Sequence, residues 1–188
     1  MPSDTRPKID GTRRRNAVET KARIVEAAQQ IFSAKGYAQA QLREIAAHAG
    51  IAVSLIPQYF GSKAELFELA LIAAMRANKA MDAPRRELGR AMIDYVLGEG
   101  DIHLPAMVIL SIGDPVSQEI TTRILREQIL TQLAERLGPP NARERAVQIT
   151  MLATGFLIYT QQLPVGDIGE RTRSKFSVLL QSIVDGNG

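Results

Sequence analysis

Residue types that usually carry catalysis or bind metals are sparse in this chain. It has two histidines, His48 and His103, far apart in the sequence, and it has no cysteine. It contains no HExxH metalloprotease motif, no GxSxG nucleophile turn, no glycine-rich phosphate loop and no cluster of metal ligands. We therefore expect no enzymatic activity, no metal and no cofactor.

Positive charge is concentrated in the first part of the chain. Residues 1–80 contain 12 Lys and Arg against 7 Asp and Glu, whereas the remainder contains 11 against 13. A basic region of this kind suits a polyanionic partner such as nucleic acid. The same charge would also fit an ordinary solvated surface, so charge alone leaves both interpretations open.

Residues 41–63, QLREIAAHAGIAVSLIPQYFGSK, predict two short helices joined by a tight turn. The first covers about 42–49 and ends at Gly50, and the second covers about 53–60 and ends at Gly61. Such a pair is a helix-turn-helix, in which the second helix enters the major groove of DNA. Ser62 and Glu65 then form a capping box that begins a longer fourth helix.

The elements before this motif are a polar arm and one amphipathic helix. Residues 1–16 are poor in apolar side chains and contain Pro2, Pro7 and Gly11, which predicts a disordered basic arm. Such an arm would either follow DNA or stay solvated. Asn16 as N-cap and Glu19 begin the first helix near Ala17. Its apolar stripe is Ile24, Ala27, Ala28, Ile31 and Phe32, and Gly36 ends it with Tyr37 packed back on Phe32.

The rest of the chain predicts one helix after another and no sheet. The expected helical spans are 84–97, 103–112, 115–137, 141–163 and 169–184, separated by glycine and proline. The fold class is therefore all-α. We expect three parts: the arm at 1–16, a DNA-binding domain at 17–80 that includes the linking fourth helix, and a ligand-binding and dimerisation domain at 81–188.

The stretch from Ala146 to Gly166 has no charged residue and is about as long as a bilayer-spanning helix. Glutamine, threonine and proline interrupt it, which favours a helix buried in a protein core and no membrane association. The polar N-terminus lacks the apolar core of a secretory signal, and the absence of cysteine fits a reducing compartment. We expect a cytoplasmic protein.

The helix-turn-helix segment resembles the TetR family of bacterial regulators. Family members typically read T-x-x-x-I-A-x-x-A-G-V-S-x-x-x-L-Y-x-x-F-x-S-K-x-x-L in this segment. The residues that match, with isoleucine standing for valine and leucine at two of them, are Ile45, Ala46, Ala49, Gly50, Ile51, Ile56, Phe60, Ser62, Lys63 and Leu66. The resemblance is strong over residues 17 to about 70. Beyond that it rests on length and helical pattern.

Three residues depart from the family pattern. Gln41 and Ala52 stand where Thr and Ser usually cap the two helices, and Pro57 replaces a common Tyr. Proline inside a helix costs about 3 kcal/mol because it removes a hydrogen bond and clashes with the preceding turn. If Ser54 is the N-cap, Pro57 occupies the third helical position, where no partner is lost. We therefore predict a recognition helix that starts late or has a tight first turn.

The resemblance implies which residues contact DNA. On the recognition helix, Gln58 is suited to adenine, Leu55 to a thymine methyl and Tyr59 to a phosphate, although Tyr59 would equally serve core packing. Lys63, at the start of the fourth helix, is suited to a phosphate. Arg43 would contact the backbone or stay solvated. The complete set of expected contacts is Gln41, Arg43, Val53, Ser54, Leu55, Gln58, Tyr59 and Lys63.

The resemblance also implies a homodimer on a palindromic operator and a four-helix interface made by the last two helices. The candidate interface residues are Ile149, Ala153, Phe156, Leu157, Phe176, Leu180 and Ile183, which would otherwise pack within one subunit. An apolar cavity with a few polar groups would bind a small-molecule effector. Its candidate residues, each also compatible with core or surface, are Met75, Met92, Tyr95, His103, Met107, Gln128, Met151, Thr154 and Tyr159.

A ligand that binds one arrangement of the domains better than another shifts the population toward it. The resemblance therefore implies a repressor that a small apolar or amphipathic ligand releases from its operator, with the fourth helix as the moving element. The alternative is a DNA-binding regulator without a physiological ligand, controlled by a protein partner.

Overall fold

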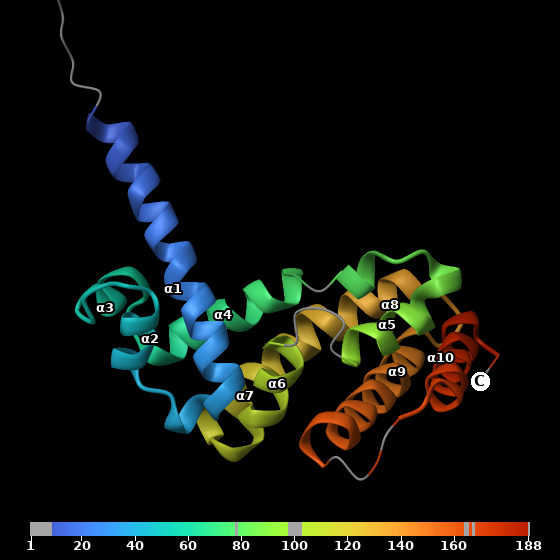
Figure 1. The fold of residues 1–188 in the computed structure, drawn as a ribbon. Coiled ribbons are helices and arrows are strands. Elements are labelled where there is room, and N and C mark those ends of the chain that lie inside the picture. Colours follow the sequence, from blue (N-terminus) through green and yellow to red (C-terminus); the bar gives the residue numbers. More distant parts are fainter. Residues whose placement is uncertain (1–8, 78, 98–102, 164–165, 167, 188) are drawn as a thin grey trace, which may run out of the picture.

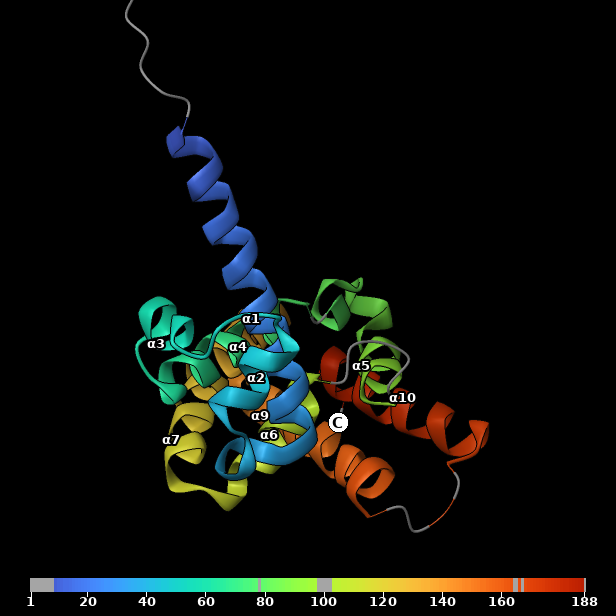
Figure 2. The ribbon, with the colours of Figure 1, turned by 60° about the vertical axis from the view of Figure 1, so that its left-hand side comes forward.

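The computed structural model describes residues 9–77, 79–97, 103–163, 166 and 168–187. Every regular element in these residues is a helix, which confirms the all-α prediction. The chain forms an N-terminal head and a second helical body, joined through α4, α6 and α7 (Figure 1). Figure 2 shows the head from another side, with α1 projecting away from the rest of the molecule.

The head is built from α1 (Ile9–Gln39), α2 (Leu42–His48), α3 (Leu55–Phe60) and α4 (Lys63–Ala77). Its core contains a cluster of aromatic rings. Phe32 of α1 meets Phe67 of α4 edge to face, with ring centroids 5.1 Å apart, and Tyr37 lies 5.3 Å from Phe67. These contacts hold α4, the helix that follows α3, in a fixed position against α1.

α1 begins eight residues earlier than predicted. Residues 9–16 are helical, so the prediction of a disordered arm over 1–16 is wrong there, and residues 1–8 lie outside the described part. Asn16 is not a cap: its carbonyl accepts a hydrogen bond of 2.7 Å from Thr20 Oγ1 inside the helix. Arg15 and Glu19 form an i,i+4 ion pair, and one glycine costs a helix only about 1 kcal/mol, so the helix continues through Gly11.

Gly36 interrupts α1 as predicted. Its φ of 73° and ψ of 170° are non-helical, and an added Cβ would lie 3.3 Å from the Cβ of Leu110 on α6. Tyr37 then stacks near Phe32, with ring centroids 6.0 Å apart, which confirms the expected packing at this helix end. Glycine is therefore required here both for the backbone angle and for the close approach of α6.

The second part of the chain confirms the predicted order of helices. In chain order the elements are η1 (Lys79–Asp82), η2 (Arg85–Glu87), α5 (Leu88–Val96), α6 (His103–Leu110), η3 (Ser111–Gly113), α7 (Pro115–Ile124), η4 (Leu125–Leu130), α8 (Thr131–Leu137), α9 (Ala142–Leu157), η5 (Ile158–Gln162) and α10 (Glu170–Asp185). The expected run at 115–137 is α7, a π-helical turn and α8 in succession. The run at 141–163 likewise ends in a π-helical turn.

Two hydrophobic cores divide the described residues. The first joins α1–α4 to Leu104 and Met107 of α6 and Ile124 of α7. The second joins α5 and α8 to α9 and α10. α6 and α7 therefore pack on the head although they follow it in sequence, and the boundary predicted at residue 80 stays a prediction.

A buried arginine connects the ends of three helices in the second body. Arg145 of α9 is 6% exposed and donates to Leu137 O at the end of α8, to Gly138 O just beyond it and to Val184 O of α10. Arg85 donates to two of these three carbonyls, Leu137 O at 2.7 Å and Val184 O at 2.8 Å. These guanidinium groups satisfy carbonyls that would have no partner at the C-terminal ends of α8 and α10.

No helix in the described residues is long and apolar enough to cross a membrane. The uncharged run that begins at Ala146 instead lies in α9 and η5. There Ala146 and Ile149 are fully buried against the rest of the second core. The run is therefore buried on one side only, because Val147, Met151 and Tyr159 are exposed on the other.

Candidate DNA interface and ligand cavity

The two helices of the helix-turn-helix are separated by a glycine turn. Ile45 and Ala46 of α2 are buried, and the main-chain N–H of Ile51 donates back to Ala46 O at 3.0 Å. Gly50 lies between them with a φ of 64°, which glycine adopts without strain. This 6→1 hydrogen bond closes the end of α2 and turns the chain toward α3.

Gln41 precedes α2 without the usual threonine. Its main-chain N–H donates to Glu44 Oε2 at 3.3 Å, which is one half of a capping box. Glu44 also accepts a 2.7 Å hydrogen bond from Lys35 Nζ, and this partner lowers the pKa of the Glu44 carboxyl. The polar ends of Gln41 and Arg43 are exposed on α2, where a DNA backbone would be accessible to them.

The recognition helix starts late and with a tight turn, as Pro57 led us to predict. Ser54 is the N-cap, and α3 spans only six residues. Before Pro57, the N–H of Leu55 donates to Ala52 O and that of Ile56 to Val53 O, both i to i−3 bonds. Pro57 is then the third residue of the helix. The carbonyls before it already accept these i to i−3 bonds, so the missing N–H of proline costs the helix no hydrogen bond.

α3 presents one apolar face to the head and one open face to solvent. Ile56 and Phe60 are buried, whereas Val53, Ser54 and Gln58 are exposed and Leu55 and Tyr59 are half-buried. Pro57 is exposed on the open face too. The sequence pointed to Pro57 only through its effect on the start of the helix. Because Pro57 is exposed and directly precedes Gln58, it also lies on the candidate DNA-binding surface.

Two lysines lie on aromatic rings beside this surface. Lys63 Nζ is 4.5 Å from the ring centroid of Tyr37, and Lys21 Nζ is 5.7 Å from that of Tyr59. Burial lowers the pKa of Lys63, although nearby Asp114 opposes that effect, and burial together with Asp114 raises the pKa of Tyr37. Lys63 therefore begins α4 as a cation held over a ring, close to the end of α3.

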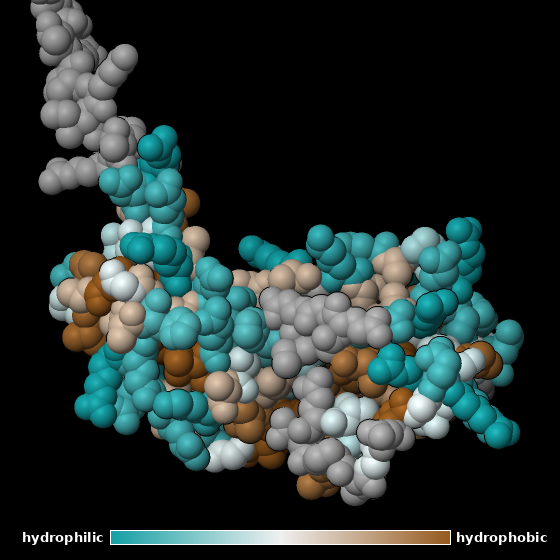
Figure 3. All heavy atoms as spheres, viewed as in Figure 1, coloured by the Kyte–Doolittle hydropathy of each residue, from teal (hydrophilic) through white to brown (hydrophobic). Residues whose placement is uncertain are grey.

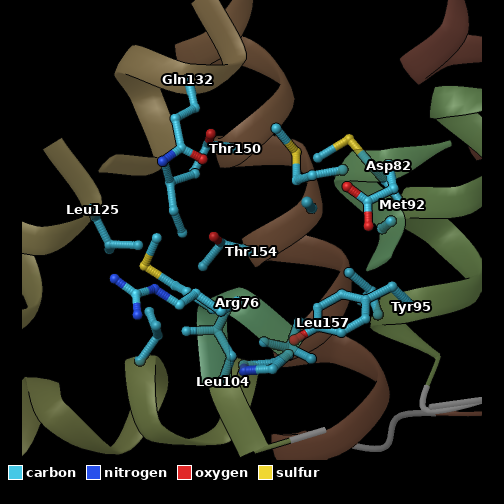
Figure 4. A pocket seen from close by; sticks show the side chains of 18 residues that line it. Arg76, Asp82, Met92, Tyr95, Leu104, Leu125, Gln132, Thr150, Thr154 and Leu157 are labelled. Carbon is cyan, nitrogen blue, oxygen red and sulfur yellow. The ribbon is translucent and has the colours of Figure 1, made fainter. Parts of the chain in front are cut away.

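A cavity of about 250 Å³ lies between the head and the second body (Figure 4). Its wall includes the last turn of α4, the 3₁₀ helix η1 and the N-terminal part of α6, together with α5, η4, α8 and α9. Methionine contributes three side chains, Met75, Met81 and Met92. The polar wall residues are Arg76, Asp82, Tyr95, Gln132, Thr150 and Thr154.

Four of the residues proposed for a ligand line this cavity: Met75, Met92, Tyr95 and Thr154. The other five do not. Met107 is buried in the first core, and His103 Nδ1 is 2.9 Å from Ser33 Oγ of α1. Gln128 is half-buried in η4, and Met151 and Tyr159 lie on the surface. Thr150, Ala153, Thr154 and Leu157 form an i, i+3, i+4, i+7 stripe that faces the cavity, and Met151 falls outside this stripe.

Five of the seven residues proposed for a dimer interface are buried inside the subunit, which corrects the expectation for those five. Ile149, Phe156, Leu157, Leu180 and Ile183 are buried, while Ala153 and Phe176 are partly buried, and all seven belong to the second core. Apolar pattern alone does not distinguish the face of a helix that packs within a subunit from one that meets a partner. The exposed apolar side chains of this region are Val147, Met151, Tyr159, Leu163, Val178 and Leu179.

Val147, Met151 and Tyr159 share one face of α9 and η5 at multiples of four residues. Gly155 belongs to the same row, and a Cβ built on it meets nothing within 4 Å. On α10, Val178 and Leu179 are exposed by 66% and 44%. In the space-filling view, hydrophobic residues appear at several places on the second body among hydrophilic ones (Figure 3). We refer to Val147, Met151, Tyr159, Val178 and Leu179 as the outer apolar surface.

Two family models match this chain. "Bacterial regulatory proteins, tetR family" matches residues 24–70, and "Tetracyclin repressor-like, C-terminal domain" matches residues 86–176. The HTH-type transcriptional regulator BetI of Burkholderia thailandensis is 26% identical over 153 residues, covering 72% of this chain and 78% of that protein. The two matched regions therefore include both the helix-turn-helix and most of the second body.

Solved structures share the fold. A putative TetR-family regulator from Mesorhizobium loti has a TM-score of 0.65 at 18% identity and covers 91% of this chain and 96% of that one. Salmonella enterica GusR has a TM-score of 0.65 at 19% identity, with 89% and 94% covered. NalD, the secondary repressor of the MexAB-OprM multidrug efflux pump in Pseudomonas aeruginosa, has a TM-score of 0.60 at 16% identity, with 91% and 96% covered.

Proposed function

Since this chain belongs to the TetR family of bacterial transcriptional regulators, which are DNA-binding proteins and not enzymes, we propose that it is a dimeric repressor released from its operator by a small ligand. The observation that carries the proposal is the open face of α3, beside the start of α4, whose last turn lines a cavity. One continuous helix therefore joins the candidate DNA surface to the candidate ligand site.

The DNA-reading surface is small and only partly polar. Gln58 offers an amide that is able to form two hydrogen bonds with adenine, and Ser54 offers a hydroxyl. Val53 and Pro57 are apolar and exposed, and they would contact thymine methyl groups. Gln41, Arg43 and Lys63 would contact phosphates on either side, which fixes register without adding sequence information.

Dimerisation is proposed through the outer apolar surface and not through the residues first expected. An exposed Met or Val in contact with a second copy would bury apolar area, which favours association by about 25 cal/mol per Å². A dimer presents two copies of α3, so its operator is expected to contain two related half-sites. The match to a model described as repressor-like favours repression over activation.

Ligand control is proposed to act through α4. Glu68 of α4 accepts a 2.8 Å hydrogen bond from Arg123 of α7, and Lys63 lies near Asp114 at the N-terminus of α7. These contacts anchor the DNA-side half of α4, whereas Met75 and Arg76 at its other end line the cavity. A ligand that favours a different position of this end would tilt α4 and change the separation of the two α3 helices.

The decisive experiment is selection of bound duplexes from a random DNA library by the purified protein at moderate salt. Enrichment of an inverted repeat is the expected result, and its half-site spacing gives the separation of the recognition helices. Binding that fades steeply with salt and enriches no motif would mean phosphate contact only, and would overturn the assignment of α3 as a base reader.

A second candidate function keeps DNA binding and removes the ligand. A regulator controlled by a protein partner would use the outer apolar surface or the exposed Ile112 and Val116 for that partner. The open cavity of about 250 Å³ favours the ligand-controlled form, because a protein-controlled regulator has no need of an unfilled space beside α4.

A further inference from the structure

The charged groups of the cavity are placed on opposite sides of it. In Figure 4 the side chain of Arg76, from the last turn of α4, stands on one side, and that of Asp82, from η1, stands on the other. Thr154 of α9 lies between them, and Gln132 and Thr150 are neighbours at one end. The remaining wall consists mainly of methionine, leucine and other apolar side chains.

Arg76 has a guanidinium that is not committed to the protein. Several exposed arginines of the described residues are paired with a carboxylate, such as Arg123 with Glu68 and Arg86 with Glu87. Arg76 is exposed at the wall of the cavity, and within the described residues its guanidinium has no hydrogen-bonding or ion-pairing partner. An arginine fork recognises a carboxylate through two parallel hydrogen bonds.

The hydroxyl of Thr154 is a second available group. Thr150 Oγ1 already donates to Ala146 O at 2.8 Å along its own helix. Thr154 forms no such bond in the described residues and points into the cavity in Figure 4. It is therefore able to donate to a ligand oxygen. Asp82, on the far side, repels a second negative charge and accepts from a donor instead.

The size of the cavity limits the ligand. About 250 Å³ is below the roughly 300–1,000 Å³ typical of sites for drug-sized molecules. The three methionines adapt to irregular apolar shapes without offering strong hydrogen bonds. The space therefore suits one small molecule with an apolar body and a single acidic group.

We propose that the effector is a small amphipathic carboxylic acid whose carboxylate is bound by Arg76 and whose apolar body lies among the methionines. This inference rests on the proposed function and specifies the ligand class of the same site. Because Arg76 is in the last turn of α4, the bound carboxylate contacts directly the helix whose other end adjoins α3. Binding of the acid therefore moves α4 without an intermediate element.

The test is binding of matched probe pairs by isothermal titration calorimetry, together with operator release in a fluorescence anisotropy assay. The probes are octanoate and 3-phenylpropionate, their neutral amides, and octylamine. The carboxylates should bind at least about tenfold more tightly than their amides, because a charge-assisted hydrogen bond exceeds a neutral one. They should also release the operator.

The Arg76→Gln variant should weaken carboxylate binding by about tenfold and leave amide binding unchanged, whereas Arg76→Lys should retain part of the preference. Asp82→Asn should not weaken carboxylate binding. Arg86→Gln is the matched control, because Arg86 is an exposed arginine outside the cavity. Circular dichroism of each variant shows that a loss of binding is not a loss of folding.

The outcomes separate this inference from the proposed function. If amides or octylamine bind better and release the operator, the ligand class is wrong and ligand control stands. If Arg76→Gln keeps the full preference for carboxylates, Arg76 is not their binding group. If no probe binds and none changes operator affinity, the inference is overturned. Unimpaired operator binding in the same assay then shows that only the DNA-binding part of the proposed function holds.

Discussion

At the scale of single residues, the open face of α3 is the surface that we propose reads DNA. Among the exposed side chains of residues 53–58, those of Gln58 and Ser54 carry polar atoms, whereas those of Val53 and Pro57 are apolar. A surface with so few hydrogen-bonding groups concentrates base discrimination in Gln58. Substitutions on this face should therefore have very unequal effects on specificity.

Gln58→Ala should reduce affinity for the selected operator by about 1–3 kcal/mol and leave affinity for unrelated duplex DNA nearly unchanged, because it removes a base contact and no charge. Electrophoretic mobility shift with both DNAs measures the two affinities. Gln118→Ala, at an exposed glutamine of α7, is the control. An equal loss on both DNAs would show that Gln58 does not read a base.

Arg145 is the residue whose loss should cost the most stability. Arg145→Met removes a buried guanidinium that bonds several main-chain carbonyls, and we expect the free energy of unfolding to fall by about 3 kcal/mol. Urea denaturation followed by circular dichroism measures this change. Arg143→Met, at an exposed position two residues earlier, should change it by less than about 0.5 kcal/mol. Similar losses in the two variants would contradict the assigned role.

At the scale of elements, the crossing of α5 and α10 depends on a glycine. A Cβ on Gly89 would lie 2.6 Å from the main-chain N of Gln181 and 2.6 Å from Ser177 O. The Gly89 N–H also donates to Gln181 Oε1 at 3.0 Å, and Gln181 Nε2 donates to Arg85 O. These contacts hold the two helices at a separation that no other residue permits.

Gly89→Ala should therefore lower the free energy of unfolding by about 1–3 kcal/mol, even though alanine is the better helix former, because α10 must move away. Thermal unfolding followed by calorimetry detects the loss. Arg90→Ala, on the exposed side of the same helix, should leave stability nearly unchanged. A more stable Gly89→Ala protein would show that the two helices separate easily.

At the scale of the whole molecule, the exposed sides of α9 and α10 are where we propose that two copies meet. The residues first expected there are the core of one subunit, and the outer apolar surface replaces them. In the proposed dimer the two recognition helices contact two half-sites together, so disrupting this surface should weaken DNA binding although the surface lies far from α3.

A double variant, Met151→Glu with Val178→Glu, should convert the dimer to a monomer, since both positions are exposed in one subunit and gain a charge that a partner would bury. Analytical ultracentrifugation measures the mass, and operator affinity should fall at least about tenfold. Val116→Glu on α7, another exposed valine, is the control. A double variant that remains dimeric would place the interface elsewhere.

The sequence by itself determined the helices and the helix-turn-helix, because their limits are local. Gly36, Gly50 and Gly61 require positive φ values at helix ends, and Pro57 dictates the late start of α3 through its missing N–H. Each of these signals acts within about four residues, so no distant contact is needed to interpret it. The exception is the start of α1, because Gly11 is too weak a helix breaker to prevent the helix from beginning at Ile9.

Only the tertiary structure decided which side of each C-terminal helix faces a neighbour, a cavity or solvent. In α9 uncharged residues occur around most of the helix, so the sequence does not distinguish which of Ile149, Thr154 and Met151 faces the core, the cavity or solvent. Packing of α5 and α10 against one side buries Ile149, leaves Thr154 at the cavity and exposes Met151. Arg76 of α4 and Asp82 of η1 line one cavity together with Thr154 of α9. This arrangement depends on contacts between segments that are far apart in the sequence, so the sequence alone does not predict it.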